Sequence, residues 1–275
     1  EVFKGGLYGA GSYNILINNE MNADQPGHAS WTGFYRAINT ANLLLKYVPG
    51  ITFKSESTKN EILAQAYIMR AYLYFIMTKT WGDLIIRTEP VESSDPAITI
   101  KERSSQEDVF KLIKEDIDKG IGLFPNNTFP SGRWKWSKPS ANALKADVYL
   151  WTGKKLNGGD ADFNTVLSAI NEIATADVDL LPKFADLFEY TNKGNREVLM
   201  SIRYQDLDGA TNLYWCMWIM SGTIPTNITS RANNIINPPG GGQNLLVITD
   251  LVRNQFTNDD LRKHASTYEI YTHND

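Results

Sequence analysis

Aromatic side chains among polar neighbours are the first residues of this chain whose types and spacing suggest chemistry. The chain holds 7 Trp, 13 Tyr and 11 Phe. Outside the predicted helices, Trp134 and Trp136 alternate with Arg133 and Lys135, and residues 214–218 place three aromatic rings in one short run. A flat aromatic ring can stack on the C–H face of a sugar while polar neighbours bond the hydroxyl groups. These rings could equally fill the places where loops fold back on a helical scaffold, and both interpretations stay open.

Signatures of catalysis and of metal binding are sparse. The sequence contains no Walker A loop, no G-x-S-x-G nucleophile elbow and no H-E-x-x-H pair. His28, His264 and His273 stand far apart, and none has a partner at the spacing of helical metal ligands. The single cysteine, Cys216, excludes an internal disulfide and a cysteine metal cluster. We therefore predict no cofactor and no metal site.

Paired carboxylates are the remaining route to catalysis, because glycoside hydrolysis uses two that face each other. Glu115, Asp116 and Asp118 fall on a predicted helix, where a solvated face is the expected role. Asp206 and Asp208 fall in a loop beside aromatic residues, and there a role in a turn outweighs a catalytic one. We predict that the protein is not an enzyme.

Composition and charge narrow the class of protein. The 275 residues are 42% hydrophobic and 21% charged, with a formal net charge of −4. A mildly acidic chain lacks the basic surface that a nucleic-acid backbone requires, so we expect no nucleic-acid partner. No apolar run approaches the roughly 18 residues of a membrane helix.

The elements that must position these residues are predicted to be helices. Residues 58–61 and 104–107 read as capping boxes, and Ser137 is expected to cap a helix with Pro139 in its first turn. Gly82 and Gly153 are expected to end helices. Apolar positions repeat at steps of three and four in residues 31–48, 62–76, 109–120 and 163–173, and residues 141–148 are expected to form a helix rich in small residues that suit close packing. Helices paired in this way indicate a tetratricopeptide-like scaffold, although no strict repeat consensus recurs.

The pattern changes after residue 176. We expect residues 1–176 to form the helical scaffold, and residues 177–275 to be an irregular, loop-rich continuation that carries the ligand-binding segment. A turn or two of helix at 183–188, a strand at 198–204 and a short helix at 249–256 are the regular elements predicted there. The predicted fold class is mainly α, a tetratricopeptide-like scaffold of helical pairs with an irregular segment and a few short strands.

Five motifs, in order along nearly the whole chain, resemble those of the SusD/RagB family. They are Trp31-x-x-x-Tyr35-x-x-Ile38-x-x-x-Asn42; Glu61-x-x-x-Gln65-Ala66-x-x-x-Arg70-Ala71-Tyr72-x-Tyr74-Phe75 with Trp81-Gly82-Asp83; Val109–Leu123 with Phe124-Pro125; Gly132-Arg133 with Ala141-x-Ala143-Leu144-Lys145-Ala146-x-Val148-Tyr149-Leu150; and Asn195-Arg196-Glu197-Val198-Leu199 with a later Asp260-Leu261-Arg262. The chain departs from the family pattern at residues 84–87, where the family usually has Pro, and at Asp147, which replaces a basic residue.

The resemblance implies a lipid-anchored protein on the outer face of a Gram-negative outer membrane. Family members capture nutrients, usually glycans, and act as a lid on a SusC-like TonB-dependent transporter. They are considerably longer, so we expect the lipid-bearing cysteine at the amino terminus and a carboxy-terminal portion to lie outside this chain. Arg70, Trp81, Asp83 and Arg133 belong to the shared motifs, and we assign them to the scaffold.

Ligand-binding residues of this family lie in variable loops, so matching motifs cannot transfer them. Chemistry selects candidates from residues 22–30 and 204–218. The predicted ligand-binding residues are Asp24, His28, Tyr204, Asp206, Tyr214, Trp215 and Trp218. The leading hypothesis is a non-catalytic glycan-binding protein. A peptide-capturing, RagB-like member with the helical scaffold as its docking surface is the alternative, and a glycosidase that uses Asp206 and Asp208 stands third.

Overall fold

The structure is a computed structural model that describes residues 3–5, 15, 18, 20–27, 30–204, 228–229, 246–266 and 272–273. The chain divides into two compact units. The helical unit comprises Ser30–Leu181 and Tyr190–Arg203, and the second unit comprises Glu1–Ala29, Pro182–Glu189 and Tyr204–Asp275. Each unit is described by itself.

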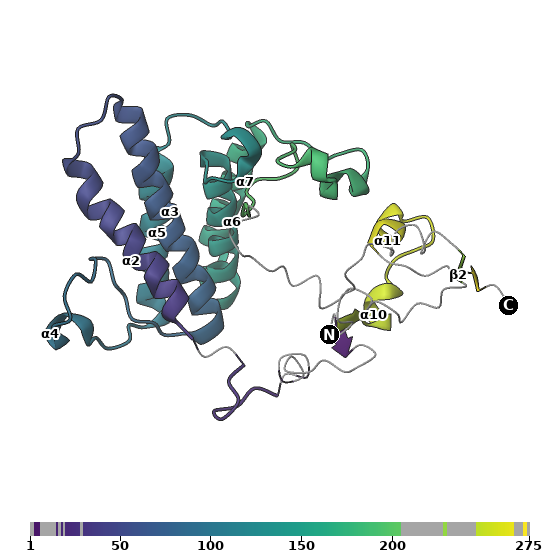
Figure 1. Ribbon diagram of the computed structural model, residues 1–275, viewed down its shortest axis with the longest axis horizontal. Coiled ribbons are helices and arrows are strands. Elements are labelled where there is room, and N and C mark those ends of the chain that lie inside the picture. Colours follow the sequence, from purple (N-terminus) through teal and green to yellow (C-terminus); the bar gives the residue numbers. More distant parts are fainter. Residues whose placement is uncertain are drawn as a thin grey trace. The chain divides into compact units, whose positions relative to one another are not determined.

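Five long helices build the helical unit (Figure 1). They are α2 (Thr32–Tyr47), α3 (Glu56–Trp81), α5 (Gln106–Leu123), α6 (Lys138–Lys155) and α7 (Gly159–Ala174). Shorter pieces are η2 (Val48–Gly50), α4 (Pro96–Thr99), η3 (Ser131–Arg133) and η5 (Tyr190–Asn192). Helix α3 packs between α2 and α5, and α6 packs against α7. The predicted mainly α fold is confirmed.

The core of this unit lies around α3, because that helix buries side chains on nearly all sides. Its buried residues contact apolar side chains from α2, α5 and α6. The largest fully buried side chains include Ile38, Ile68, Tyr74, Phe75, Met77, Ile113, Ile117 and Val148. A Cβ atom at Gly120 of α5 would lie 2.6 Å from Cδ1 of Ile68, so the missing side chain is what lets α5 approach α3.

Helix caps correct three details of the sequence analysis. The N-cap of α3 is Ser55, whose side chain accepts a hydrogen bond from the backbone N–H of Thr58, so Thr58 lies inside the first turn. The N-cap of α5 is Ser105, one residue later than predicted. Gly153 does not end α6; a Cβ atom there would lie 2.7 Å from the Phe163 ring, so this glycine allows α7 to pack closely. The predicted roles of Ser137 and Gly82 are confirmed.

The second unit holds short elements. They are β1 (Phe3–Gly5), η4 (Phe184–Phe188), β2 (Ile228–Thr229), β3 (Leu246–Ile248), α10 (Asp250–Arg253), α11 (Leu261–Ser266) and β4 (Thr272–His273). Strand β1 pairs antiparallel with β3, and β2 pairs antiparallel with β4. The helical turns predicted near 183–188 and 249–256 are confirmed as η4 and α10.

The strand predicted at 198–204 is wrong. This segment belongs to the helical unit up to Arg203 and forms no ladder. Instead, the backbone N–H of Ser201 donates to the carbonyl of Arg133 at 3.0 Å, so the segment is held by a loop and not by a neighbouring strand.

Candidate functional site

Two of the predicted ligand-binding residues lie in the described part of the chain, and both are exposed. Asp24 lies in a turn that Asn22 stabilises. The side-chain oxygen of Asn22 accepts hydrogen bonds from the backbone N–H groups of Asp24 and Gln25, at 3.0 and 2.9 Å. Tyr204 is 63% exposed. Outside the described residues lie His28, Asp206, Tyr214, Trp215 and Trp218, together with Asp208 and Cys216. The assembly of these residues into one site therefore stays a prediction.

A buried ion pair joins two helices at the centre of the helical unit. Arg70 of α3 donates from Nε and Nη2 to the two carboxylate oxygens of Asp116 of α5, at 2.7 and 2.8 Å. Asp116 is completely buried. The expectation of a solvated face was therefore wrong for Asp116, although it holds for Glu115 and Asp118, whose side chains are about half exposed.

The ion pair extends into a network that fixes residues 85–89, here called the 85–89 segment. Nη1 of Arg70 donates to the side-chain oxygen of Asn42 and to the carbonyl of Thr88. The amide nitrogen of Asn42 donates in turn to the carbonyls of Arg87 and Glu89, at 3.0 and 3.2 Å. These bonds satisfy backbone groups that regular secondary structure does not pair.

Two tyrosines complete the clamp on this segment. The hydroxyl of Tyr35 donates to the carbonyl of Ile85 at 2.8 Å, and the hydroxyl of Tyr74 accepts the backbone N–H of Arg87 at 2.7 Å. Burial raises the pKa of both phenols, so both hydroxyls keep their protons well above neutral pH. Residues of the first two sequence motifs thus position one loop of the scaffold.

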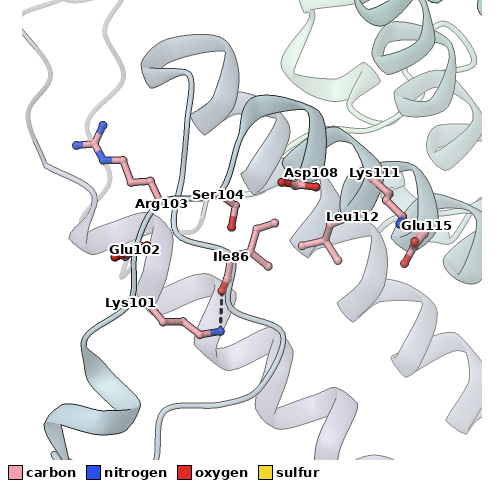
Figure 2. A pocket seen from close by; sticks show the side chains of 9 residues that line it. All are labelled: Ile86, Lys101, Glu102, Arg103, Ser104, Asp108, Lys111, Leu112 and Glu115. Atoms are coloured by element: carbon pink, nitrogen blue, oxygen red, sulfur yellow. Dashed lines mark hydrogen bonds between the residues drawn. The ribbon is translucent and has the colours of Figure 1, made fainter.

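The clamped segment forms part of a cleft of about 600 Å³ (Figure 2). Ile86 stands at its centre, and α5 contributes one side of it. Backbone hydrogen bonds in both directions between Leu84 and Ser104 hold the two loop strands together, and Lys101 donates to the carbonyl of Ile86 at 3.3 Å. The lining residues are Ile86, Lys101, Glu102, Arg103, Ser104, Asp108, Lys111, Leu112 and Glu115.

The cleft suits polar contact better than sugar stacking. Three cationic and three acidic side chains line it, and none of its lining residues is aromatic. Arg103 lies over the ring of Trp31 at 4.7 Å, and Asp108 accepts a hydrogen bond from the hydroxyl of Ser105, so both side chains are already engaged. The sequence analysis did not predict this cleft. Lys111, Leu112 and Glu115 belong to the third motif, but the cleft forms only because the loops that carry Ile86 and residues 101–104 fold beside α5.

The two loop tryptophans, Trp134 and Trp136, differ in their exposure to solvent. Trp136 is 6% exposed and packs edge-on against Tyr72, with ring centroids 5.3 Å apart, so it fills the scaffold. Trp134 is 38% exposed, and cations from Lys135 and Arg203 lie over its ring, at 4.9 and 5.4 Å from the centroid. Only Trp134 of this pair keeps a ring surface that a ligand could reach.

The described residues offer neither a metal-binding cluster nor a membrane-spanning helix. In that part of the chain, no three His, Cys, Asp or Glu side chains are grouped so as to hold a metal ion. No helix among the described residues has the length and apolar character to cross a membrane.

The chain is similar in sequence to proteins of one known family. The sequence pattern of the family SusD-like_3, described as "Starch-binding associating with outer membrane", matches residues 7–150. A SusD-like protein of Bacteroides ovatus is 26% identical over 235 residues, which are 82% of this chain and 42% of the relative. SusD-like protein P38 of Formosa agariphila is 32% identical over 214 residues, which are 72% of this chain and 39% of the relative. The chain thus spans about two fifths of the length of these curated relatives.

Solved structures agree with the sequence relatives. The structure of B. fragilis NanU, at 30% identity, superposes with a TM-score of 0.84 over 96% of this chain and 55% of its own. A structure solved with a xylogluco-oligosaccharide is 28% identical, with a TM-score of 0.53 over 64% of this chain and 35% of its own.

Proposed function

Because this chain belongs to the SusD-like family of starch-binding proteins that associate with the outer membrane, we propose that it captures glycans without transforming them. In this proposal the full-length protein is lipid-anchored at the cell surface and delivers oligo- or polysaccharides to a SusC-like TonB-dependent transporter. The carrying observation is the family match over residues 7–150. A similar structure, solved with a xylogluco-oligosaccharide, supports a glycan as the class of ligand.

The chemistry of the helical unit supports binding without catalysis. Its buried carboxylates, Asp116 and Asp162, each bind a cation of the scaffold: Arg70 in the first case and Lys114 in the second. Asp162 also accepts a hydrogen bond from the hydroxyl of Thr152. A carboxylate engaged in this way holds helices together and is poorly placed to exchange a proton with a ligand.

Recognition is assigned to the two loops selected from the sequence. Asp24 and Tyr204 present exposed polar and aromatic groups in the described part of these loops. Trp215 and Trp218, with Tyr214 and the acceptors His28 and Asp206, would supply a stacking face and hydrogen bonds. Affinity from such contacts is modest, because hydrogen bonds to sugar hydroxyls are exchanged against water.

Substitution of the two tryptophans tests this assignment. We expect Trp215→Ala and Trp218→Ala each to weaken binding of a xyloglucan or starch oligosaccharide about two- to tenfold, since one aromatic contact contributes about 0.5–1.5 kcal/mol. Isothermal titration calorimetry on the full-length protein measures this change. Tyr47→Ala is the matched control, because Tyr47 is an exposed aromatic residue of α2 that belongs to neither loop.

Three results would revise the proposal. Unchanged affinity for every bound glycan in both tryptophan variants would remove the stacking face at 214–218. Shortening of the glycan during incubation would contradict a non-catalytic role. Binding of oligopeptides in place of glycans would favour the peptide-capturing alternative.

Delivery to a transporter is tested separately. We expect the full-length protein, purified from detergent-solubilised outer membranes, to retain a SusC-like transporter as its main partner. Recovery of the protein without such a partner would contradict the delivery step and would leave glycan capture intact.

A further inference from the structure

The loop that carries Trp134 has two consecutive residues with positive φ angles just before the tryptophan. Gly132 and Arg133 both adopt left-handed conformations, with φ of 73° and 53°. A non-glycine residue in this region costs free energy that the surroundings must offset. Gly194 packs directly on this turn, because a Cβ atom at position 194 would lie 2.7 Å from the Cα atom of Gly132.

The side chain of Arg133 holds this turn in place. It is 5% exposed, and it lies 3.9 Å from the ring centroid of Phe129. Nη1 donates to the carbonyls of Arg196 and Val198, at 3.3 and 3.0 Å, and Nη2 donates to the carbonyl and the carboxylate of Asp177. Arg133 therefore ties the turn to the segment that leads to Arg203.

This support presents the next residue, Trp134, to solvent. A Cβ atom at position 132 would lie 2.9 Å from Cδ1 of Trp134, so the glycine leaves room for the indole. Gly194 and Arg133 pack the turn against the scaffold, and Trp134 keeps 38% of its surface exposed. A ring whose backbone is already held in one conformation can contact a ligand without a further cost of ordering the turn.

The charges around the ring indicate the class of ligand. Lys135 and Arg203 lie over the indole, and among the described residues neither forms an ion pair. The contrast is Tyr47, a ring that is 50% exposed and lies beside Lys46, whose ammonium group is neutralised by Glu92. Two cations that have no ion-pair partner among the described residues lie at this one aromatic ring, and they favour a sugar that also carries negative charge.

From this geometry we propose that Trp134, Lys135 and Arg203 form a second glycan-binding surface, the Trp134 platform, for sugar rings that bear a carboxylate or a sulfate group. The ring of the sugar stacks on the indole, and its anionic group lies between the ammonium and the guanidinium. The proposal rests on the glycan-binding function above and adds a ligand class and a place on the helical unit. Arg133 is a positioning residue of this platform.

The test compares anionic and neutral ligands on the same variants. Isothermal titration calorimetry on the full-length protein uses oligogalacturonate, a sulfated carrageenan oligosaccharide and a neutral xyloglucan oligosaccharide. We expect Trp134→Ala to weaken binding of an anionic oligosaccharide about two- to tenfold. We expect the double variant Lys135→Gln/Arg203→Gln to weaken it about threefold or more and to remove most of its dependence on salt.

Matched controls keep the result specific. Tyr47→Ala removes an exposed ring whose cation is neutralised, so it should leave all three affinities unchanged. Binding of the neutral oligosaccharide should be unaffected in every platform variant. Far-ultraviolet circular dichroism verifies that the exposed substitutions leave the fold intact.

The outcomes separate this proposal from the general one. Wild-type affinity of Trp134→Ala for both anionic ligands overturns the platform, as does binding of the neutral oligosaccharide alone; in either case glycan capture stands. Loss of anionic binding only in Trp215→Ala or Trp218→Ala likewise places the ligand elsewhere. Failure of every glycan to bind would overturn the proposed function and this platform with it.

Discussion

At the scale of single residues, motif side chains act mainly on backbone groups of the scaffold. Arg70 and Asn42 bond carbonyls of the 85–89 segment, and Asp116 neutralises the buried guanidinium. Moving two charges out of water costs free energy. The bidentate pair and its further hydrogen bond offset that cost only when both charged partners are present. These contacts give Arg70, Asn42 and Asp116 a role in the scaffold.

Loss of one partner of the buried pair should therefore be severe. We expect Asp116→Ala to lower the free energy of unfolding by about 3–5 kcal/mol, because Arg70 would be left charged and unpaired in the core. Asp118→Ala on the same helix is the control; Asp118 is half exposed and pairs with Lys145 at the surface, so its loss should cost about 1 kcal/mol or less. Urea denaturation followed by circular dichroism measures both, and equal effects would contradict the buried role of Asp116.

Alkaline pH should loosen the same clamp. The raised pKa of Tyr74 means that, above about pH 10, the unfolded chain loses a phenol proton that the folded protein keeps. The contribution of Tyr74 to the free energy of unfolding is therefore complete below about pH 10. Above that pH it decreases, by up to about 1.4 kcal/mol per pH unit.

Urea denaturation between pH 8 and 11 measures this dependence. Tyr74→Phe should be less stable at neutral pH, because the N–H of Arg87 loses its acceptor, and its stability should fall less steeply with rising pH. An identical slope in the variant and the wild type would show that Tyr74 does not titrate as described.

At the scale of helices and loops, close approach depends on small residues at particular places. Gly120 faces Ile68 across the contact of α5 with α3. Gly122 lies two residues further along the same helix, and a Cβ atom placed there would have no neighbouring atom within 4 Å. The same residue type therefore has opposite consequences at two neighbouring positions.

The two glycines of α5 give a matched pair of substitutions. We expect Gly120→Ala to destabilise the protein by about 1–3 kcal/mol through overpacking against the buried Ile68. Gly122→Ala should be neutral or stabilising by up to about 1 kcal/mol, because alanine has the higher helix propensity and open space around it. Thermal or urea unfolding checks both, and a destabilised Gly122→Ala would show that α5 is packed differently.

Most of the long helices and some of their boundaries could be predicted from the sequence. The 3.6-residue period of apolar positions located four of the five long helices, and Ser137 and Gly82 set boundaries correctly. Gly153 was misread as a stop because the pattern alone does not distinguish a glycine that ends a helix from one that admits a neighbouring helix. Asp116 was misread because its charge was weighed above its position, three residues after the buried Ile113 and next to the buried Ile117.

The candidate site could be predicted only in part. Trp134 and Trp136 have the same type and similar neighbours, yet one is exposed and the other buried. The difference depends on the left-handed turn at Gly132 and Arg133 and on the contact with Gly194, which lies 62 positions further along the chain than Gly132. Local sequence patterns do not encode contacts of that separation.

At the scale of the whole molecule, the shared motifs build a scaffold, and the function proposed above assigns ligand recognition to the loops. Trp81 packs on Trp31, Asp83 accepts the first backbone N–H of α5, and Arg133 anchors the turn before Trp134. A solved structure that is 30% identical superposes on this scaffold with a TM-score of 0.84. A fold held by such contacts can in principle carry different loops. The central claim is that the family scaffold here serves glycan capture.

Native affinity electrophoresis of the full-length protein tests that claim most directly. The protein is run through gels cast with a panel of neutral, carboxylated and sulfated polysaccharides, beside a gel without polysaccharide. The account predicts retardation by one or a few of these glycans, with the glycan left undegraded. Mobility that is unchanged across the whole panel would contradict glycan capture.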